Sequence, residues 1–138
     1  MKRNKVLVIG SGRLGSSIAT KLSELGDDVL IIDANQDAFR KLQEAFSGYE
    51  VVGDATDLMV LEQAYIKQAK SVIITTDNDN TNIYVAHLAY YIYDVPEIFV
   101  RLSDTDKGSL IDDTNIKAIY PFTLSINEFL KLYEENDI

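Results

Sequence analysis

The sequence predicts an α/β fold in which a six-stranded, doubly wound parallel sheet is covered by helices on both faces. Short, β-branched apolar runs recur along the chain, segments with helical apolar spacing lie between them, and a glycine-rich turn follows the first run. A strand that is buried on both faces needs a nearly continuous apolar run, and parallel neighbours need a crossover between them. With the glycine turn after the first strand, the expected strand order is 3-2-1-4-5-6.

Six apolar runs mark the expected strands. They are rich in valine and isoleucine and are short enough to be strands. In chain order the runs are Val6–Ile9, Val29–Ile32, Glu50–Val52, Ser71–Thr75, Ile98–Leu102 and Ile116–Ile119. Because these runs alternate with helical segments, we expect all six strands to be parallel.

Between the strands, apolar residues recur with the spacing of one helix face. In chain order, four helices are marked by Leu14, Ile18, Leu22 and Leu25, by Ala38, Leu42, Ala45 and Phe46, by Leu58, Leu61, Tyr65 and Ile66, and by Ile83, Ala86, Leu88, Ala89 and Ile92. The expected helix ends are Gly26, Ser47-Gly48 and Asp94 with Pro96, and the expected N-cap of the third helix is Thr56 or Asp57.

A last helix is expected at residues 122–138. Leu124, Ile126, Phe129, Leu130 and Tyr133 give it a broad apolar face at the end of a chain whose core is already complete. Such a face packs either on the chain's own sheet or on a neighbouring molecule. We therefore expect this helix to be available for dimer contacts.

Composition limits the classes of function. The 138 residues suffice for one core but not for a separate catalytic domain, so residues 1–138 are expected to form a single domain. A net charge of −9 argues against binding to nucleic acid, and the absence of cysteine excludes disulfides and thiolate chemistry. No apolar run has the length of a membrane span. We expect a cytoplasmic protein that meets a membrane only through a partner.

A glycine-rich loop, Gly10-Ser11-Gly12-Arg13-Leu14-Gly15, follows the first strand and opens the first helix. In such a loop, Gly10 permits a tight turn, Gly12 lets a phosphate approach the backbone, and Gly15 lets the helix pack close to the strand. Arg13 adds a cation that can pair with a phosphate or reach a neighbouring subunit. The loop in this context predicts a Rossmann-like nucleotide-binding fold.

Asp33 ends the second strand, 18 residues after Gly15. A carboxylate at this place can accept hydrogen bonds from both ribose hydroxyls. A 2′-phosphate would meet like charge there, and Ala34-Asn35-Gln36-Asp37 offers no arginine to compensate. NADP is therefore disfavoured, and NAD, NADH, ATP, ADP and AMP remain open as ligands. The alternative role for Asp33 is that of a helix cap.

Residues at the ends of the other strands complete the expected site. Asp54, with the Ala55 backbone beside it, can accept from an adenine amino group. Arg101 at the end of the fifth strand can reach a phosphate or form a surface salt bridge. The expected site residues are Gly10, Ser11, Gly12, Arg13, Leu14, Gly15, Asp33, Ala34, Asp54, Ala55, Thr75, Thr76, Asp77 and Arg101.

No catalytic or metal-binding set accompanies this site. His87 is the only histidine, and none of the eight tyrosines has a lysine four residues on, as short-chain dehydrogenases require. The run Asp77–Asn82 lacks the glycine of a calcium loop at its sixth position and is expected to cap the fourth helix. These features predict a nucleotide sensor and not an enzyme. A small NAD-dependent oxidoreductase, or a subunit of one, is the alternative, and a structural domain with a vestigial site is the third hypothesis.

These motifs together resemble the RCK/KTN domain, the TrkA N-terminal domain of potassium uptake transporters and channels. The resemblance rests on the glycine loop with Arg13, Ile32-Asp33, Gly53-Asp54-Ala55-Thr56, Thr75-Thr76-Asp77-Asn78-Asp79 with Asn82, Phe99-Val100-Arg101 and Ile119-Tyr120-Pro121. It implies a cytosolic regulatory subunit that binds NAD(H) or an adenine nucleotide and gates an integral-membrane potassium transporter or channel subunit. It also implies a homodimer as the building block, with a higher ring assembly as a further expectation. Relatives often continue into a second lobe, so a minimal family member and an excised fragment both remain open.

Overall fold

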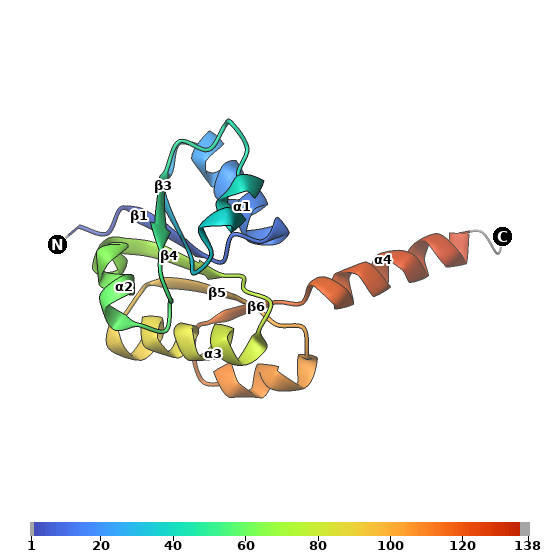
Figure 1. Ribbon diagram of the computed structural model, residues 1–138. Coiled ribbons are helices and arrows are strands. Elements are labelled where there is room, and N and C mark those ends of the chain that lie inside the picture. The colour runs from blue at the N-terminus through green and yellow to red at the C-terminus, as the bar shows by residue number, and fades with distance from the viewer. Residues whose placement is uncertain (1, 136–138) are drawn as a thin grey trace.

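The computed structural model describes residues 2–135, which form one parallel sheet with helices on both faces and a projecting C-terminal helix (Figure 1). The strands are β1 (Lys5–Ile9), β2 (Asp28–Asp33), β3 (Tyr49–Val52), β4 (Ala69–Ile74), β5 (Glu97–Arg101) and β6 (Lys117–Ile119). The α-helices are α1 (Arg13–Glu24), α2 (Leu58–Gln63), α3 (Asp79–His87) and α4 (Pro121–Glu135). Shorter segments are the 3-10 helices η1 (Gln36–Lys41), η2 (Ile66–Gln68) and η4 (Thr105–Ile111) and the π-helix η3 (Leu88–Ile92).

The strands pair in the order β3-β2-β1-β4-β5-β6, and every pair is parallel, so the predicted fold class is confirmed. Ile9 at the end of β1 lies opposite Ile32 of β2 and Ile74 of β4. The carboxyl ends of the three central strands therefore lie side by side, and the residues that follow them meet at one edge of the sheet. The chain order reverses between β1 and β4, which makes this edge a topological switch point.

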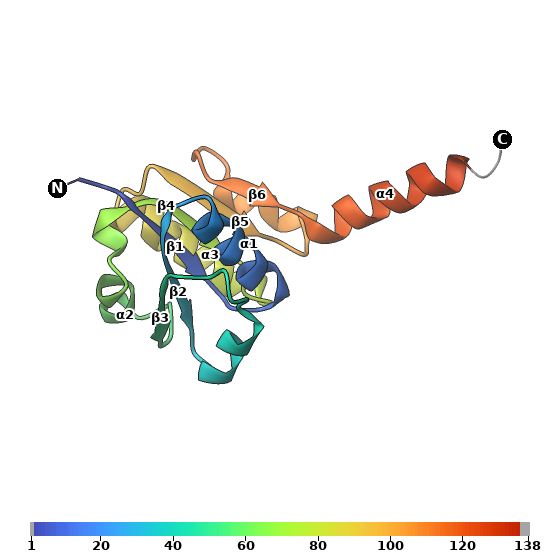
Figure 2. The same ribbon diagram turned by 90° about the horizontal axis from the view of Figure 1, so that it is seen from above.

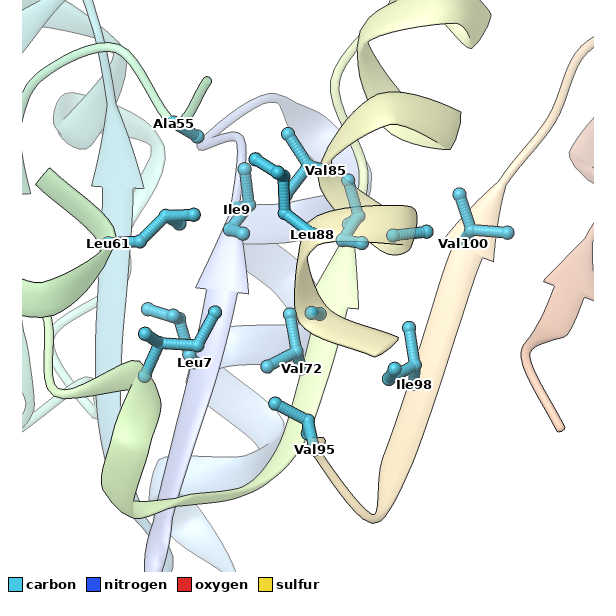
Figure 3. Close-up of a cluster of buried hydrophobic side chains, with 14 of the residues drawn as sticks. Leu7, Ile9, Ala55, Leu61, Val72, Val85, Leu88, Val95, Ile98 and Val100 are labelled. Atoms are coloured by element: carbon cyan, nitrogen blue, oxygen red, sulfur yellow. The ribbon is translucent and has the colours of Figure 1, made fainter. Parts of the chain in front are cut away.

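Alternation along β1 divides the core between the two faces of the sheet. Leu7 and Ile9 belong to the larger cluster, which α2, α3 and η3 cover and which Figure 3 shows. Val6 and Val8 belong to a smaller cluster on the opposite face, which α1 and η1 cover. Each strand of the centre is thus buried on both sides, as its continuous apolar run requires.

The second predicted helix is wrong in type and extent. The chain forms only the 3-10 segment η1, which Asn35 caps by accepting from the Asp37 N–H (3.0 Å) and after which Leu42 is extended. Farther on, the Ser47 N–H donates to Ser23 Oγ of α1 (2.9 Å). Apolar spacing cannot reveal such a contact between distant residues.

Other helix boundaries differ less. Gly26 (φ 93°) ends α1 and Asp94 (φ 52°) follows η3, so both predicted ends are confirmed. α2 stops before Tyr65, which takes a left-handed conformation (φ 61°), and Ile66 begins η2. Leu25 is 78% exposed and does not belong to the buried face of α1. η4 lies between β5 and β6, where the sequence predicts no helix.

The last helix, α4, leads away from the sheet (Figures 1 and 2). It begins at Pro121, a residue well suited to the first helical position. None of its residues is buried, so it does not pack on its own sheet. Like every other helix within residues 2–135, α4 is not both long and apolar enough to cross a membrane. Residues 136–138, which the predicted helix includes, lie outside the described part of the chain.

Candidate nucleotide-binding site

A cavity of about 420 Å³ lies at the carboxyl edge of the sheet, around the switch point between β1 and β4. Its volume is in the range of small-molecule sites, and open α/β sheets bind their ligands at this edge. The cavity is lined by Ile9, Gly10, Ser11, Gly12, Ile32, Asp33, Ala34, Asn35, Ala38, Lys41, Gly53, Asp54, Ala55, Thr75, Thr76, Asp77, Thr81 and Arg101. The ends of five strands, β1 to β5, therefore converge on one hollow.

All but three of the predicted site residues line this cavity. The exceptions are Arg13, which is exposed at the start of α1, the half-buried Leu14 and the buried Gly15. The structure thus brings together residues from the ends of five strands that are far apart in the sequence. It leaves the Arg13 side chain outside the lining.

The cavity is also lined by residues that are not among the predicted site residues. These are Ile9, Ile32, Asn35, Ala38, Lys41, Gly53 and Thr81. Lys41 matters most because it adds a cation to the cavity, whereas residues 34–37 contain none. It is the last residue of η1. No motif in the sequence marks it as a site residue.

The glycine loop depends on two close approaches. Gly10 has φ 97°, and a Cβ there would lie 3.0 Å from the Thr76 nitrogen. A Cβ at Gly15 would overlap the Gly10 carbonyl oxygen and Thr75 Oγ1, so only glycine lets α1 pack this close to β4. Gly12 differs, because nothing lies within 4 Å of its Cβ position and it borders the cavity.

Gly12 is also the N-cap of α1, and it supplies no side chain to that helix end. The N–H groups of a first helical turn have no partner within the helix. Together with the positive end of the helix dipole, such groups favour an anion. The start of α1 therefore offers a phosphate backbone donors beside the cavity.

Backbone N–H groups hold both carboxylate oxygens of Asp33. Oδ2 accepts from the Ser11 N–H (2.8 Å), and Oδ1 accepts from the Asn35 N–H (2.9 Å). Each oxygen keeps a lone pair for a second donor, such as a ribose hydroxyl. Asn35, not Asp33, caps η1, so the alternative role of Asp33 as a helix cap is wrong.

Asp54 closes a turn directly after β3. Its Oδ1 accepts from the Thr56 N–H (2.9 Å) and the Thr56 hydroxyl (2.7 Å). These hydrogen bonds hold the pKa of the Asp54 carboxyl below its usual value, so this group stays charged at neutral pH. Ala55 is buried beside it and lines the same cavity.

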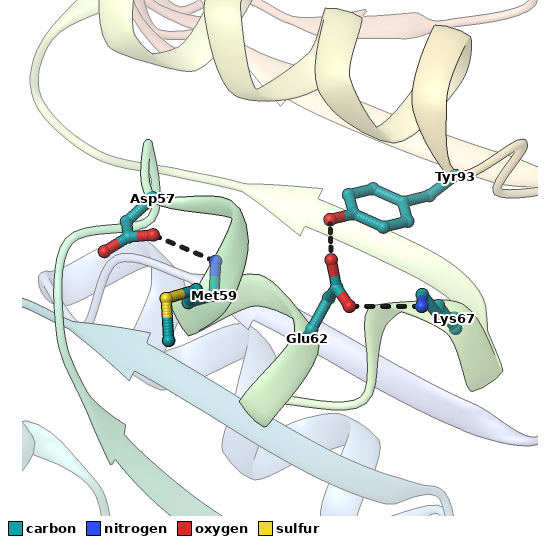
Figure 4. Close-up of polar contacts among 5 residues, drawn as sticks. All are labelled: Asp57, Met59, Glu62, Lys67 and Tyr93. Atoms are coloured by element: carbon teal, nitrogen blue, oxygen red, sulfur yellow. Dashed lines mark hydrogen bonds and ion pairs between the residues drawn. The ribbon is translucent and has the colours of Figure 1, made fainter.

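Helix α2 begins next to this turn and is anchored at both ends (Figure 4). Asp57 caps it by accepting from the Met59 N–H (2.9 Å), as one of the two predicted caps. At the other end, Glu62 accepts from the Tyr93 hydroxyl (2.8 Å) and pairs with Lys67 (3.1 Å). Burial raises the pKa of Tyr93 to about 12, and the hydrogen bond from Tyr93 lowers the pKa of Glu62. Both groups therefore keep their charge states through the neutral range.

Buried Asn82 joins the ends of β4 and β5. Its Nδ2 donates to the carbonyl oxygens of Thr76 (2.9 Å) and Arg101 (2.9 Å), and the Thr76 hydroxyl donates to its Oδ1. Asn78 caps α3 by accepting from the Thr81 N–H (3.0 Å), which confirms the predicted capping role of this loop. The sequence places Asn82 in a motif, but only the structure shows that it is a buried crosslink.

Arg101 lines the cavity and carries an unusual donor. The residue is half-buried, and its Nε is buried without a hydrogen-bond partner among residues 2–135. It forms no ion pair within that part of the chain, so the surface salt bridge left open by the sequence is not observed there. A buried cationic donor without an acceptor favours the binding of an anion.

The single histidine lies outside the cavity. His87 Nε2 is 2.8 Å from the Leu110 carbonyl oxygen, a contact that ties α3 to η4. Within residues 2–135, no group of three or more histidine, cysteine, aspartate or glutamate side chains is arranged to hold a metal ion. Charged side chains such as Asp33, Asp54 and Arg101 instead gather around the cavity.

Solved structures share this architecture. The RCK domain of GsuK superposes with a TM-score of 0.82 and is 23% identical, over 97% of this chain and 29% of that one. The GsuK channel has been solved bound to NAD, and GsuK has been solved bound to ADP. The Kef CTD of Shewanella denitrificans, solved in an AMP-bound form, superposes with a TM-score of 0.71 and is 26% identical, over 94% of this chain and 81% of that one.

Sequence comparison finds a relative that is named as part of a potassium uptake system. The Trk system potassium uptake protein TrkA homolog of Pyrococcus horikoshii is 32% identical over 129 residues, which are 93% of this chain and 57% of that protein. This chain therefore spans little more than half the length of that relative. The model of the TrkA-N domain family matches residues 6–121, which include the glycine loop, Asp33 and Arg101. The chain belongs to the TrkA-N domain family.

Proposed function

We propose that this chain is a regulatory domain of a potassium transport system and that it binds NAD(H) or an adenine nucleotide, namely ATP, ADP or AMP. The observation that carries the proposal is the convergence of Asp33, the open start of α1 at Gly12 and the unpaired Arg101 on one cavity. The AMP-bound Kef CTD, at 26% identity, supports the ligand class. The Trk relative supports the potassium system.

The proposed arrangement follows the order of the strands. The adenine lies by Asp54 and Ala55 after β3, and the ribose hydroxyls donate to Asp33 at the end of β2. The first phosphate accepts from the backbone at the start of α1, next to Gly12. Each group of the ligand then meets a protein group of complementary charge or hydrogen-bonding capacity.

Calorimetric titration with AMP, ADP, ATP, NAD, NADH and NADP tests this proposal. We expect at least one nucleotide without a 2′-phosphate to bind. Its affinity should fall by about tenfold or more in Asp33→Ala, because the ribose hydroxyls then lose a charged acceptor. The matched control is Asp37→Ala, which removes an exposed carboxylate that contacts only Arg40 (3.7 Å) and does not line the cavity.

Absence of binding to all six nucleotides would refute the proposal. Equal affinities of the wild type and Asp33→Ala would instead favour a domain with a vestigial site. Oxidation or reduction of the bound dinucleotide by the isolated chain would favour the alternative of a small oxidoreductase.

The regulatory part of the proposal requires a partner. The domain sits in the cytoplasm against the inner face of the membrane and acts on an integral-membrane potassium transporter or channel subunit. A nucleotide can change that partner only if the assembly has two arrangements with different affinities for the ligand. The relevant measurement is nucleotide affinity with and without the membrane partner, and identical affinities would contradict gating.

Two unpaired apolar surfaces on the same chain support a homodimer. α4 exposes Phe122, Ile126, Phe129, Leu130 and Tyr133 along one side. A mostly apolar groove of about 390 Å³ lies beside α1 and is lined by Val6, Ile18, Leu22, Asp27, Lys70, Ser71, Ile73, Glu97, Phe99 and Ile119. Only Tyr120 separates β6 from α4, and the helix leads away from the sheet with none of its residues buried (Figures 1 and 2). In the proposed dimer, α4 of each copy lies in the groove of the other, and a ring of such dimers remains a prediction.

We expect Phe129→Glu to convert the dimer into a monomer, because it places a charge in the middle of the buried helix side. The measurement is mass by light scattering after size-exclusion chromatography. Leu124→Glu is the matched control. The sequence pattern places Leu124 in the same apolar face, but it lies on the opposite side of α4 from Phe129, because the two residues are five positions apart on the helix. The two side chains are similarly exposed (63% and 60%). A wild-type monomer at all concentrations, or a dimer that survives Phe129→Glu, would contradict this arrangement.

A further inference from the structure

We infer that Arg101 is a specificity-determining residue that recognises the group beyond the first phosphate of the ligand. The site then prefers nucleotides with a second phosphate, such as ADP and NAD, over AMP. This inference rests on the proposed nucleotide-binding function and assigns one discriminating role within that site.

Arg101 lies at the β5 end of the sheet edge that borders the cavity. From one end of the cavity to the other, the strands follow the order β3, β2, β1, β4 and β5. Asp33 ends β2, Gly10 follows β1, and Arg101 ends β5. With neighbouring strands about 4.8 Å apart, β5 lies about 10 Å from β1.

This spacing separates a mononucleotide from longer ligands. When the ribose of AMP meets Asp33, its phosphate reaches the start of α1 beside β1, and the ligand ends there. A second phosphate extends the ligand past Thr75 and Thr76 of the β4 end towards β5. The guanidinium of Arg101 is then the cation that meets it from the far side of the cavity.

The Arg101 side chain is not fully hydrogen-bonded within the described residues. Its Nε is buried and lacks a hydrogen-bond partner among residues 2–135, although a buried donor without an acceptor is costly. The guanidinium is always charged, and its planar donors suit phosphate oxygens. Arg101 lines the cavity and forms no ion pair among residues 2–135, so an anionic group in the cavity would meet an unpaired positive charge.

The main chain of Arg101 is held in place by Asn82. Asn82 Nδ2 donates to its carbonyl oxygen (2.9 Å), and the same amide nitrogen holds Thr76 at the end of β4. The base of the side chain is therefore set relative to the β4 end, where the second phosphate would lie. Asp77 lines the same region but is exposed, so water and salt weaken its repulsion of an anion.

The other cation of the cavity has a different place. Lys41 belongs to η1, which follows β2, and so lies on the side of the adenosine and the first phosphate. We therefore assign it no role in separating AMP from ADP. Of the two cations that line the cavity, only Arg101 is then placed to separate ADP from AMP.

The experiment is calorimetric titration of the full chain with AMP, ADP and NAD. We expect the wild type to bind ADP and NAD more tightly than AMP. In Arg101→Gln, affinity for ADP and NAD falls by about ten- to a hundredfold, the range for a hydrogen bond to a charged group, while AMP affinity changes less than about twofold. Arg101→Lys, which keeps the charge but not the planar donors, recovers part of the ADP affinity.

Lys107→Gln is the matched control for the loss of one positive charge. Lys107 bonds to Asn80 Oδ1 (3.1 Å) and does not line the cavity, so we expect no change in any of the three affinities. An equal loss of AMP and ADP affinity in Arg101→Gln, or no loss of either, would overturn the inference and leave nucleotide binding intact. If the wild type binds none of the three ligands, the proposed function itself fails. If Arg101→Gln does not fold, the ratio of ADP to AMP affinity in the wild type decides, and a ratio near one overturns the inference.

Discussion

Replacing Gly15 by alanine is expected to destabilise the protein by about 3 kcal/mol or more, the upper range for overpacking a rigid interior. Helix propensity alone predicts the opposite, because alanine in a helix is about 1 kcal/mol more favourable than glycine. The steric effect wins, since the added Cβ would overlap the Gly10 carbonyl oxygen, which belongs to backbone and cannot rotate away. Thr75 Oγ1, the second atom in its way, is itself buried and lies 3.0 Å from the carbonyl oxygens of Ile9 and Gly10.

Urea denaturation measures this loss, and Gly12→Ala is the matched control from the same loop. Nothing lies within 4 Å of the Gly12 Cβ position, so the loss of stability should not exceed about 1 kcal/mol, the cost of alanine at the N-cap of α1. Its nucleotide affinity should fall, because the methyl group stands where a phosphate approaches the start of α1. A Gly15→Ala protein as stable as the wild type would show that α1 can move away from β4.

The second large effect is expected for Asn82→Leu, at about 3 kcal/mol of lost stability. The substitution leaves the carbonyl oxygens of Thr76 and Arg101 without their buried partner, whereas the Thr76 hydroxyl keeps its contacts with the backbone of Asn78 (3.3 Å). Each unsatisfied buried group costs about 1–3 kcal/mol, and leucine returns only part of this through added apolar burial. Because Asn82 fixes the ends of β4 and β5, we also expect weaker binding of ADP to any fraction that remains folded.

Asn80→Leu is the control for this prediction. Asn80 lies on the same helix but is exposed, and its side chain accepts only from Lys107 (3.1 Å). Its substitution should change the free energy of unfolding by less than about 0.5 kcal/mol. Equal effects of the two substitutions in a denaturant series would mean that the buried crosslink does not hold the strand ends together.

The strands and their order could be predicted because they depend on local patterns. A run such as Val6–Ile9 has no polar face, so it must lie between two layers, and that requirement is visible in the residues themselves. The glycine loop then fixes which strand is central. The strand-end residues Asp33, Asp54 and Arg101 converge because parallel strands bring their carboxyl ends to one edge.

The second helix could not be predicted in the same way. Its apolar spacing fits an α-helix, but the chain becomes extended at Leu42, and Ser47 then donates to Ser23 Oγ of α1 (2.9 Å). That contact joins residues 24 positions apart, and no window of helical length contains both.

The sequence by itself therefore determined the fold class, the family and most of the cavity lining. These follow from period, glycine positions and strand-end residues, which act over one strand or one turn. Only the tertiary structure decided that Asn82 is a buried crosslink, that the Arg101 Nε lacks a partner and that α4 leaves its own sheet uncovered. The physical reason is that burial and hydrogen-bond satisfaction depend on every element that packs nearby, whereas the sequence pattern of an element reports only its own preference.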